Sequence, residues 1–505
     1  MATKTWAGTS GNWSTPTLWL GSTVPAAADI AAIEGSAGTD TIVLNDTESV
    51  GGVVLNGTNA AVELTGVLNL GGQLDAQSGT LVLSGTLQGG TLVQNGAAIQ
   101  FADLDPVTGQ VVAPELVNVD VTGTLDISGS STSLEVIGLA QSGVAAIKIG
   151  AGSELMVLDE ETFTGETIDL AGGVLASDAA DPNDGFIQIG FGTEVLQDAP
   201  NTTARIGADV ISAGFGLGSV VNHGTIIANA GTLLLDAEGG VFTSEFGLGA
   251  FTNAGTIEIG AGATVVDDTN ATFAGLGTIL NAGGLLDLRG TLTNTGTTVD
   301  VGTTGAFREL QLDGMVLGGT ILEAGGSLSV GTASLQHVTV VGTGVAFDTL
   351  TIGPNTVFNP AGGRFLLTAQ QAAYGQIFLN NGAVLTNAAI AYGDTQYEVQ
   401  IAVAGDGVSA SGTVLSGIVP SATLASTTTL DVGAGQILLL DGGDGTLVND
   451  AVINVAAGGI LRFGNAATYV PGGTINVVPD SLVEFTGSIG LPLWIGSCWS
   501  RRLPS

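Results

Sequence analysis

The chain has 505 residues, of which 46 are acidic and 9 are basic, which gives a net charge of -37. A surface this negative excludes nucleic acids and anionic lipid headgroups as partners, because both are bound through Lys and Arg. Hydrophobic residues make up 44% of the chain, enough for a large core. No run approaches the ~18 consecutive apolar residues of a membrane helix, so membrane insertion is not expected.

Residues 1–35 differ from the rest in tryptophan content, with three of the 5 tryptophans of the chain. These are Trp6, Trp13 and Trp19. In a repeat fold the first strands must be covered, since an open strand edge pairs with other chains. We therefore predict that residues 1–35 form an N-terminal cap. The opening MATKTWAGTSGNW contains no apolar core of a secretory signal peptide.

From residue 36 to residue 489 the sequence repeats a short phrase built on Gly-Thr. Apolar residues alternate with polar ones inside it, as at Ile257 and Ile259, which indicates a strand with one buried face. Glycine between such strands permits the positive φ of a tight turn. The phrase that carries an Asn recurs as NHGTI from Asn222, NAGTL from Asn229, NAGTI from Asn253, NAGGL from Asn281 and NTGTT from Asn294.

The spacing of the repeat indicates a solenoid. Gly255, Gly277, Gly296 and Gly319 each precede Thr and follow one another at nearly even intervals. An imperfect repeat of about 20 residues is typical of a coil of short strands, each stacked in parallel on its counterpart in the next coil. The sequence therefore predicts an all-β parallel solenoid. An array of β-sandwiches is the alternative, and it requires longer strands and more aromatic residues than the 5% found here.

The N-x-G-T-[IL] phrases resemble the passenger regions of bacterial autotransporters and filamentous-haemagglutinin-like surface proteins. The Trp-rich opening is similar to the start of many β-strand-repeat surface proteins of bacteria. The resemblance implies a right-handed parallel β-helix that serves as an adhesin, stalk or scaffold. It also implies an extracellular or cell-surface location.

These features together favour a non-enzymatic adhesin or structural scaffold, built as a long β-helical rod that self-associates end to end into filaments. Its expected partners are glycans or proteins on the surface of a host or neighbouring cell. No catalytic residue is assigned.

Two other functions remain as alternatives. A glycan-active enzyme, of the polysaccharide lyase or hydrolase kind, requires clustered carboxylates and a basic residue on neighbouring coils. The densest acidic run, with Asp159, Glu160, Glu161 and Glu166, is interpreted as a solvated edge. His223 and His337 lie far apart in the sequence, and His223 is interpreted as an exposed turn residue.

The second alternative is a Ca²⁺-dependent surface-layer protein. The stretch GGDGTLVND from Gly442 resembles a calcium-binding nonapeptide but places Leu447 where the Asp ligand belongs. Acidic and amide side chains crowd a loop elsewhere and are the candidate Ca²⁺ ligands: Asp178, Asp181, Asn183 and Asp184. Without such a site, no cofactor is expected.

The region 363–405 is predicted to be an irregular or inserted part of the solenoid, because the Gly-Thr phrase disappears there. It holds three of the 4 tyrosines, Tyr374, Tyr392 and Tyr397, which are candidate binding residues. Residues 490–505 are predicted to be an atypical tail outside the repeat. They hold the single cysteine, Cys498, so no disulfide can form within the chain.

Overall fold

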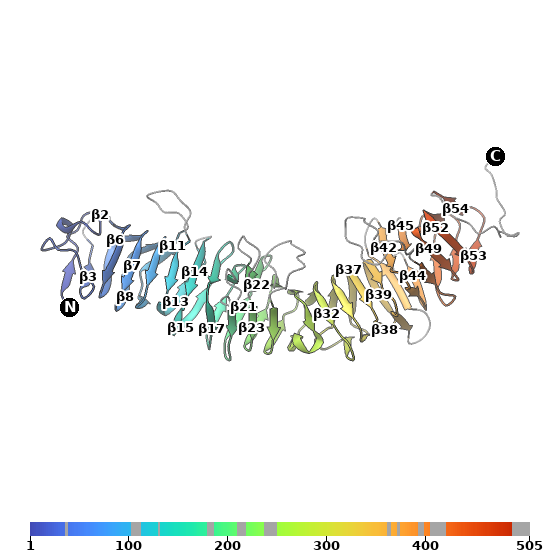
Figure 1. Ribbon diagram of the computed structural model, residues 1–505, viewed down its shortest axis with the longest axis horizontal. Helices are drawn as coiled ribbons and strands as arrows, with labels where there is room; N and C mark the ends of the chain where they lie inside the picture. The colour runs from blue at the N-terminus through green and yellow to red at the C-terminus, as the bar shows by residue number, and fades with distance from the viewer. Residues whose placement is uncertain are drawn as a thin grey trace. The chain divides into compact units, whose positions relative to one another are not determined.

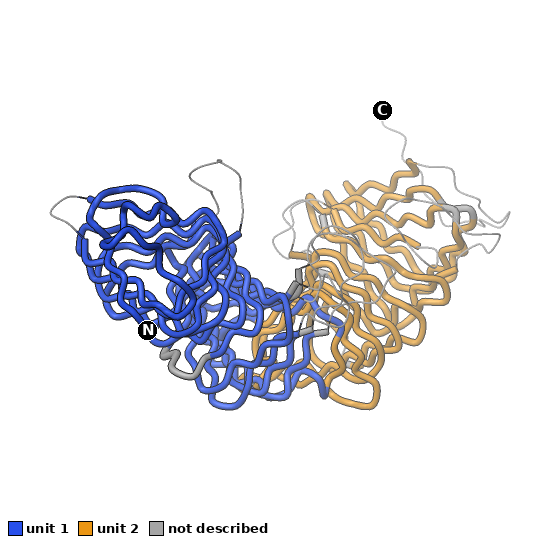
Figure 2. The backbone as a smooth tube through the Cα atoms, turned by 60° about the vertical axis from the view of Figure 1, so that its left-hand side comes forward, with its two compact units in different colours: residues 1–270, 274–285 blue, residues 271–273, 286–505 orange. Residues whose placement is uncertain are grey.

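The computed structural model describes residues 1–35, 39–102, 113–129, 132–178, 186–209, 219–236, 250–360, 365–370, 374–391, 398–403 and 421–486. Strands dominate these residues. They contain no α-helix, only the two 3₁₀ turns η1 (Pro16–Leu18) and η2 (Phe273–Leu276). The chain divides into two compact units, unit 1 with residues 1–270 and 274–285, and unit 2 with residues 271–273 and 286–505 (Figure 2).

Unit 1 is a stack of coils whose strands form parallel rows along the unit (Figure 1). The first row is β1 (Thr3–Thr5), β3 (Ile30–Ile33), β6 (Gly52–Leu64), β8 (Gln73–Leu83), β10 (Thr91–Gln94), β13 (Asp120–Asp126), β15 (Ala140–Lys148), β18 (Thr167–Asp169), β21 (Glu194–Gln197), β24 (Thr225–Ala228), β27 (Thr256–Ile259) and β30 (Thr278–Asn281). The second row is β5 (Thr47–Val50), β7 (Val67–Leu70), β9 (Thr86–Gln88), β12 (Glu115–Val117), β14 (Ser133–Ile137), β16 (Glu154–Val157), β19 (Val174–Asp178), β22 (Thr203–Asp209), β25 (Thr232–Asp236) and β28 (Thr264–Asp268).

Shorter rows complete the third side of the coils in unit 1. One row is β17 (Glu160–Phe163), β20 (Phe186–Ile189), β23 (Ser219–Asn222) and β26 (Ala250–Asn253). Nearer the N-terminus, β2 (Gly11–Asn12) pairs with β4 (Asp40–Leu44), β4 pairs with β6, and β11 (Ala98–Phe101) pairs with β8.

Unit 2 is built in the same way. One row is β31 (Leu285–Leu288), β34 (Glu309–Leu312), β37 (Ser327–Gln336), β39 (Gly344–Ile352), β41 (Phe365–Ala369), β44 (Ala388–Ala391), β47 (Thr429–Val432), β50 (Val452–Val455) and β53 (Thr474–Val477). A second row is β29 (Ala271–Thr272), β32 (Thr291–Thr293), β35 (Met315–Leu317), the later halves of β37 and β39, β42 (Tyr374–Leu379), β45 (Glu398–Val403), β48 (Ile437–Asp441), β51 (Ile460–Phe463) and β54 (Leu482–Phe485). The third side has β33 (Thr298–Gly302), β36 (Thr320–Ala324), β38 (Thr339–Gly342) and β40 (Val357–Pro360), then β43 (Val384–Leu385), β46 (Ser421–Leu424), β49 (Gly443–Asn449) and β52 (Ala466–Pro471).

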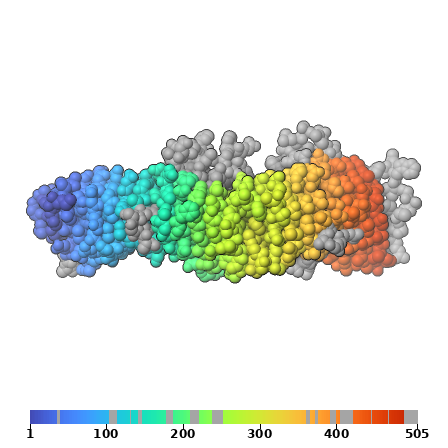
Figure 3. All heavy atoms as spheres, turned by 90° about the horizontal axis from the view of Figure 1, so that it is seen from below, coloured from blue at the N-terminus to red at the C-terminus, as the bar shows by residue number. Residues whose placement is uncertain are grey.

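The paired strands in both units are parallel, as a solenoid requires, and the prediction of a parallel β-helix is confirmed. Coil length varies around the expected value. The coil between the paired residues Ile257 and Ile279, and the coil between the paired residues Val330 and Phe347, are close to the expected length of about 20 residues. The coil between the paired residues Ile401 and Leu440 is much longer. Because coils stack in chain order, the colours of the space-filling view follow one another in bands within each unit (Figure 3).

The core of each unit consists of apolar ladders made by alternate residues of successive strands. Ile168, Val195, Ile226 and Ile257 pair in turn, and none is more than 4% exposed. Each such side chain gains roughly 1.5–3 kcal/mol by leaving water. A single coil cannot bury these residues alone, so stacking supplies most of the stability.

The glycines of the repeated phrase are needed for two different reasons. Gly277, Gly296 and Gly319 have positive φ angles of 62°, 79° and 73°, as the tight-turn interpretation predicted. Gly255 does not have a positive φ. A Cβ at Gly255 would overlap the carbonyl oxygen of Gly224 in the previous coil. The close approach of two backbones therefore excludes a side chain there.

One non-glycine corner should be improvable by substitution. His337 joins β37 to β38 with a φ of 57°, and its side chain is exposed. The left-handed conformation costs a residue with a Cβ roughly 1–2 kcal/mol, although Gly loses more entropy on folding. We expect His337→Gly to stabilise unit 2 by about 0.5–1 kcal/mol, measured by hydrogen exchange across β37 and β38. Asn355→Gly, at a φ of 58°, should gain less, since Asn tolerates this conformation. An equal or larger gain at Asn355 would contradict the explanation.

Candidate functional site

The three N-terminal tryptophans form one buried cluster. Trp19 lies at its centre, with its ring 5.0 Å from that of Trp6 and 4.9 Å from that of Trp13, both edge to face. The three side chains are 5%, 1% and 1% exposed for Trp6, Trp13 and Trp19. Backbone bonds from Trp6 to Ala32 and from Trp13 to Val43 attach the cluster to β3 and β4. These indoles are core residues, and their faces are not open to a sugar ring.

The other predicted site residues fall largely outside the described residues. Asp181, Asn183, Asp184, Tyr392 and Tyr397 all lie outside them, as does the tail 490–505. The backbone of Asp178 ends β19, and that of Tyr374 begins β42. Within 363–405, strands β41, β42, β44 and β45 each pair in parallel with strands of neighbouring coils.

The asparagine of the repeated phrase forms a buried ladder at one corner of unit 1. Asn222 and Asn253 are 0% and 3% exposed. The side-chain oxygen of each accepts the backbone N–H two residues later, and Nδ2 of Asn222 donates to Oδ1 of Asn253 at 2.8 Å. Nδ2 of Asn253 donates to the carbonyl of Leu276 in the following coil. The Asn therefore satisfies buried corner groups, a structural role.

The acidic run around β17 was interpreted as a solvated edge, and only part of it is exposed. Asp159 and Glu160 are exposed, but Glu161 and Glu166 are 7% and 6% exposed. Oε2 of Glu161 accepts the backbone N–H of Leu139 at 2.9 Å. The hydroxyl of Thr193 lies 3.4 Å from Oε2 of Glu166. The side chain of Glu161 occupies an inward position of β17, on the same face as the buried Phe163, whereas Glu160 lies on the outer face.

His223 is half-buried rather than fully exposed, and it lies against an aromatic ring. The ring of Phe191, on the previous coil, stacks on it at 5.5 Å, and Phe191 is 78% exposed. The prediction that His223 belongs to a turn is confirmed, because it lies between β23 and β24.

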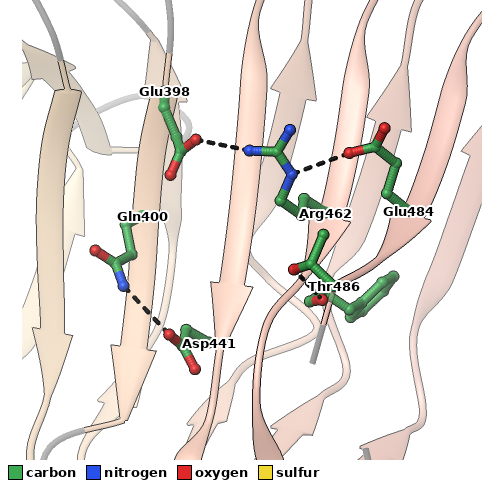
Figure 4. A network of polar contacts seen from close by, with 7 residues as sticks. Glu398, Gln400, Asp441, Arg462, Glu484 and Thr486 are labelled. Carbon is green, nitrogen blue, oxygen red and sulfur yellow. Dashed lines mark hydrogen bonds and ion pairs between the residues drawn. The ribbon is translucent and has the colours of Figure 1, made fainter. Parts of the chain in front are cut away.

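Two arginines of the described residues, Arg205 and Arg462, form ion pairs with carboxylates of neighbouring coils. Arg462 of β51 shows this most fully: its Nε lies 3.0 Å from Glu484 of β54 and its Nη1 lies 3.1 Å from Glu398 of β45 (Figure 4). In the same view, the amide of Gln400 donates to Asp441. Glu398 and Arg462 lie several strands apart in the sequence, so only the stacking of coils brings them together.

Unit 1 has the same kind of charge pairing. Asp126, Lys148 and Asp169 stand opposite one another on β13, β15 and β18, with the lysine in the middle. Arg205 of β22 pairs with Asp236 of β25 at 3.4 Å. These outward rows bring opposite charges together and hold adjacent coils in register.

We call three carboxylates on nearby coils of unit 2, Asp287, Asp313 and Asp348, the aspartate row. Asp313 and Asp348 occupy equivalent positions of their coils, and Asp287 lies in register with Gln311. Asp287 of β31 is 3% exposed, and its Oδ2 accepts from Arg289 at 2.9 Å. Its Oδ1 is buried and has no donor among the described residues. Asp313 follows β34, and Asp348 lies on β39 two coils further on.

Hydrogen bonds fix the carboxylate of Asp313 in the middle of the aspartate row. Its Oδ2 accepts from Nε2 of Gln311 at 2.6 Å, and its Oδ1 accepts from the backbone N–H of Thr332 at 2.7 Å. Burial, with a contribution from the charge of Asp313, raises the pKa of Asp287 to about 6 although Arg289 opposes the change. Burial and the same charge also raise the pKa of Asp348.

Asp267 is a second buried carboxyl. It lies at a position where the preceding coils have apolar residues. Leu175, Ile206 and Leu235 precede it in register, and Asp267 takes the next place on β28. It is 6% exposed and accepts from the backbone N–H and the hydroxyl of Thr269 at 3.1 Å and 2.5 Å. Burial raises its pKa to about 6.

The described part of the chain contains neither a metal-binding cluster of side chains nor a helix that could span a membrane. No three or more His, Cys, Asp or Glu side chains are arranged there to hold a metal ion. Among the same residues, no helix has the length and apolar character that a membrane span requires. Comparison with known proteins found no matching family model, no matching curated protein and no matching solved structure.

Proposed function

We propose that this protein is a non-enzymatic adhesin or structural scaffold, displayed at a bacterial cell surface or secreted. The observation that supports this most is the continuity of the coils. Parallel ladders run from strand to strand through each unit, and Asn and charged side chains tie neighbouring coils together at corners and outer faces. Such a surface offers a long repeated face for binding rather than one enclosed site.

The acidic character of the outer faces is part of this proposal. With a net charge of -37, the protein repels other acidic polymers and stays soluble outside the cell. Its partners would be neutral glycans or proteins of a host or neighbouring cell. End-to-end association into filaments belongs to the same proposal, and sedimentation of the purified chain would show it as species larger than a monomer.

The location is tested by protease treatment of intact source cells, with the released peptides identified by mass spectrometry. Peptides from both units should appear without lysis, while peptides of an abundant cytosolic protein, the control, should not. If peptides of this chain appear only after lysis, the surface proposal is wrong.

A glycan-active enzyme is a second candidate, because the aspartate row and Arg289 place carboxylates and a base on neighbouring coils. The burial of Asp287 weighs against this candidate, since a side chain 3% exposed cannot contact a polysaccharide directly. Incubation with a panel of neutral and acidic glycans would measure new reducing ends and unsaturated products. Cleavage that is lost in Asp313→Asn, with the fold retained, would replace the scaffold proposal by the enzyme.

A further inference from the structure

The final described coil of unit 2 exposes side chains that continue the buried ladders. Val455 pairs with Val477, and Phe463 pairs with Phe485. Val455 and Phe463 are 1% and 3% exposed, whereas Val477 and Phe485 are 46% and 51% exposed. No strand of the described residues pairs with the outer edges of β53 and β54. The core of unit 2 is therefore open at this end of the stack.

This open end carries the largest group of exposed apolar side chains in the described residues. We call residues 466–486, with β52, β53 and β54, the last coil (Figure 1). One face of the Phe485 ring stacks on Phe463 at 5.1 Å. An apolar patch beside an unpaired strand edge favours contact with another chain segment. The exposed apolar side chains of the last coil are Val470, Val477, Val478, Leu482 and Phe485.

The first coils of unit 1 do not have such an open core. Trp6 and Trp13 bond through their backbones to β3 and β4, and their side chains are 5% and 1% exposed. Beside them, Ala31 and Ile33 of β3 are 0% exposed. The chain therefore places large aromatic residues against the first strands, and the described residues place nothing comparable against the last ones.

We propose that residues 487–505 bind the last coil and cover its exposed apolar side chains. The chain leaves β54 next to Thr486, at the open end itself. Residues 487–505 lie outside the described residues, and they are nearly as long as one coil of about 20 residues. Their sequence supplies the apolar residues that this contact requires: Ile489, Leu491, Leu493, Trp494, Ile495 and Trp499.

Charge favours this segment over a second copy of the chain. Residues 487–505 contain Arg501 and Arg502 and no acidic residue, whereas the whole chain has a net charge of -37. A second copy would bring one acidic chain against another, with the exposed Asp480 on both sides of the contact. The segment is also tethered beside its site, which raises its effective concentration there. Association of two chains through this end, which belongs to the proposed function, would then require the segment to leave the last coil.

Cys498 allows a direct test, because it is the only cysteine of the chain and lies in this segment. The full chain would carry a photoactivated cross-linker on the thiol, and the cross-linked peptides would be identified by mass spectrometry. An equal mixture of unlabelled and isotope-labelled chains separates contacts within one chain from contacts between two chains. We expect the main cross-link to join Cys498 to residues 466–486 of the same chain.

Phe485→Ser should lower the yield of this cross-link by up to about tenfold, because the lost ring removes apolar area from the contact. Trp494→Ser should lower it in the same way while leaving the described residues unchanged. Leu280→Ser is the matched control, since Leu280 is 53% exposed but belongs to unit 1, and the yield should not change.

Protection of the amides of β50 and β51 against hydrogen exchange verifies that the coil below the last one is folded in each variant. An absence of cross-links to residues 466–486 would overturn the inference, as would an equal yield in Trp494→Ser and Leu280→Ser. Cross-links that join a labelled chain to an unlabelled one would overturn it in favour of a second copy of the chain.

Discussion

Trp19→Ala is expected to cost about 3–5 kcal/mol of local stability at the N-terminal end of unit 1, the range for truncating a buried Trp. Trp19 is 1% exposed, packs edge to face against both Trp6 and Trp13, and donates from Nε1 to the carbonyl of Trp13 at 2.8 Å. Its removal leaves a cavity between the two remaining indoles, and the backbone N–H groups of Trp6 and Trp13 bond to Ala32 of β3 and Val43 of β4. The same change should increase aggregation if this segment caps the strand edges.

The measurement is hydrogen exchange of the amides of β3 and β4, which reports opening of the first coils without requiring the whole chain to unfold in one step. Phe191→Ala is the control, since the ring removed is 78% exposed and its loss should change stability by less than about 0.5 kcal/mol. Unchanged protection of β3 and β4 in Trp19→Ala would show that the cluster does not stabilise these coils.

Asp267→Asn is expected to stabilise unit 1 by about 3 kcal/mol at pH 8 and to have little effect at pH 4, since the pKa of Asp267 is raised by burial from 3.8 to about 6 and each unit of difference is worth about 1.4 kcal/mol. Because the folded-state pKa is the higher one, the contribution is favourable below pH 3.8 and is lost as the pH rises through about 6. The Asn oxygen can still accept from Thr269.

Hydrogen exchange across β25 and β28 at the two pH values measures this effect. Asp268→Asn is a close control, because Asp268 is the next residue and its side chain is exposed. Asp268→Asn removes one negative charge from the chain, as Asp267→Asn does, but the charge that it removes is exposed. A gain at pH 8 that is equal in the two variants would mean that general charge repulsion, rather than burial of Asp267, is responsible.

The architecture could be predicted from the residues alone, because its signal is local. Alternation at Ile257 and Ile259 specifies which face of a strand is buried, and the Gly-Thr phrase specifies where a coil turns. The three tryptophans form one buried cluster within residues 1–35, and the role of this segment as a cap stays a prediction. The repeated phrase also contains the asparagines of the buried ladder. Gly255 is needed because the backbone of the previous coil leaves no room for a Cβ, and not because of its own φ.

The meeting of particular charged residues, by contrast, could be learned only from the folded coils. Coil length varies widely within one chain, as the pairs Val330–Phe347 and Ile401–Leu440 show, so no fixed spacing identifies neighbours across coils. Arg462 therefore joins Glu398 and Glu484 without any signature in the sequence. Alternation with the buried Val265 places Asp267 on the inner face of β28, but the apolar ladder that it interrupts consists of residues from other coils.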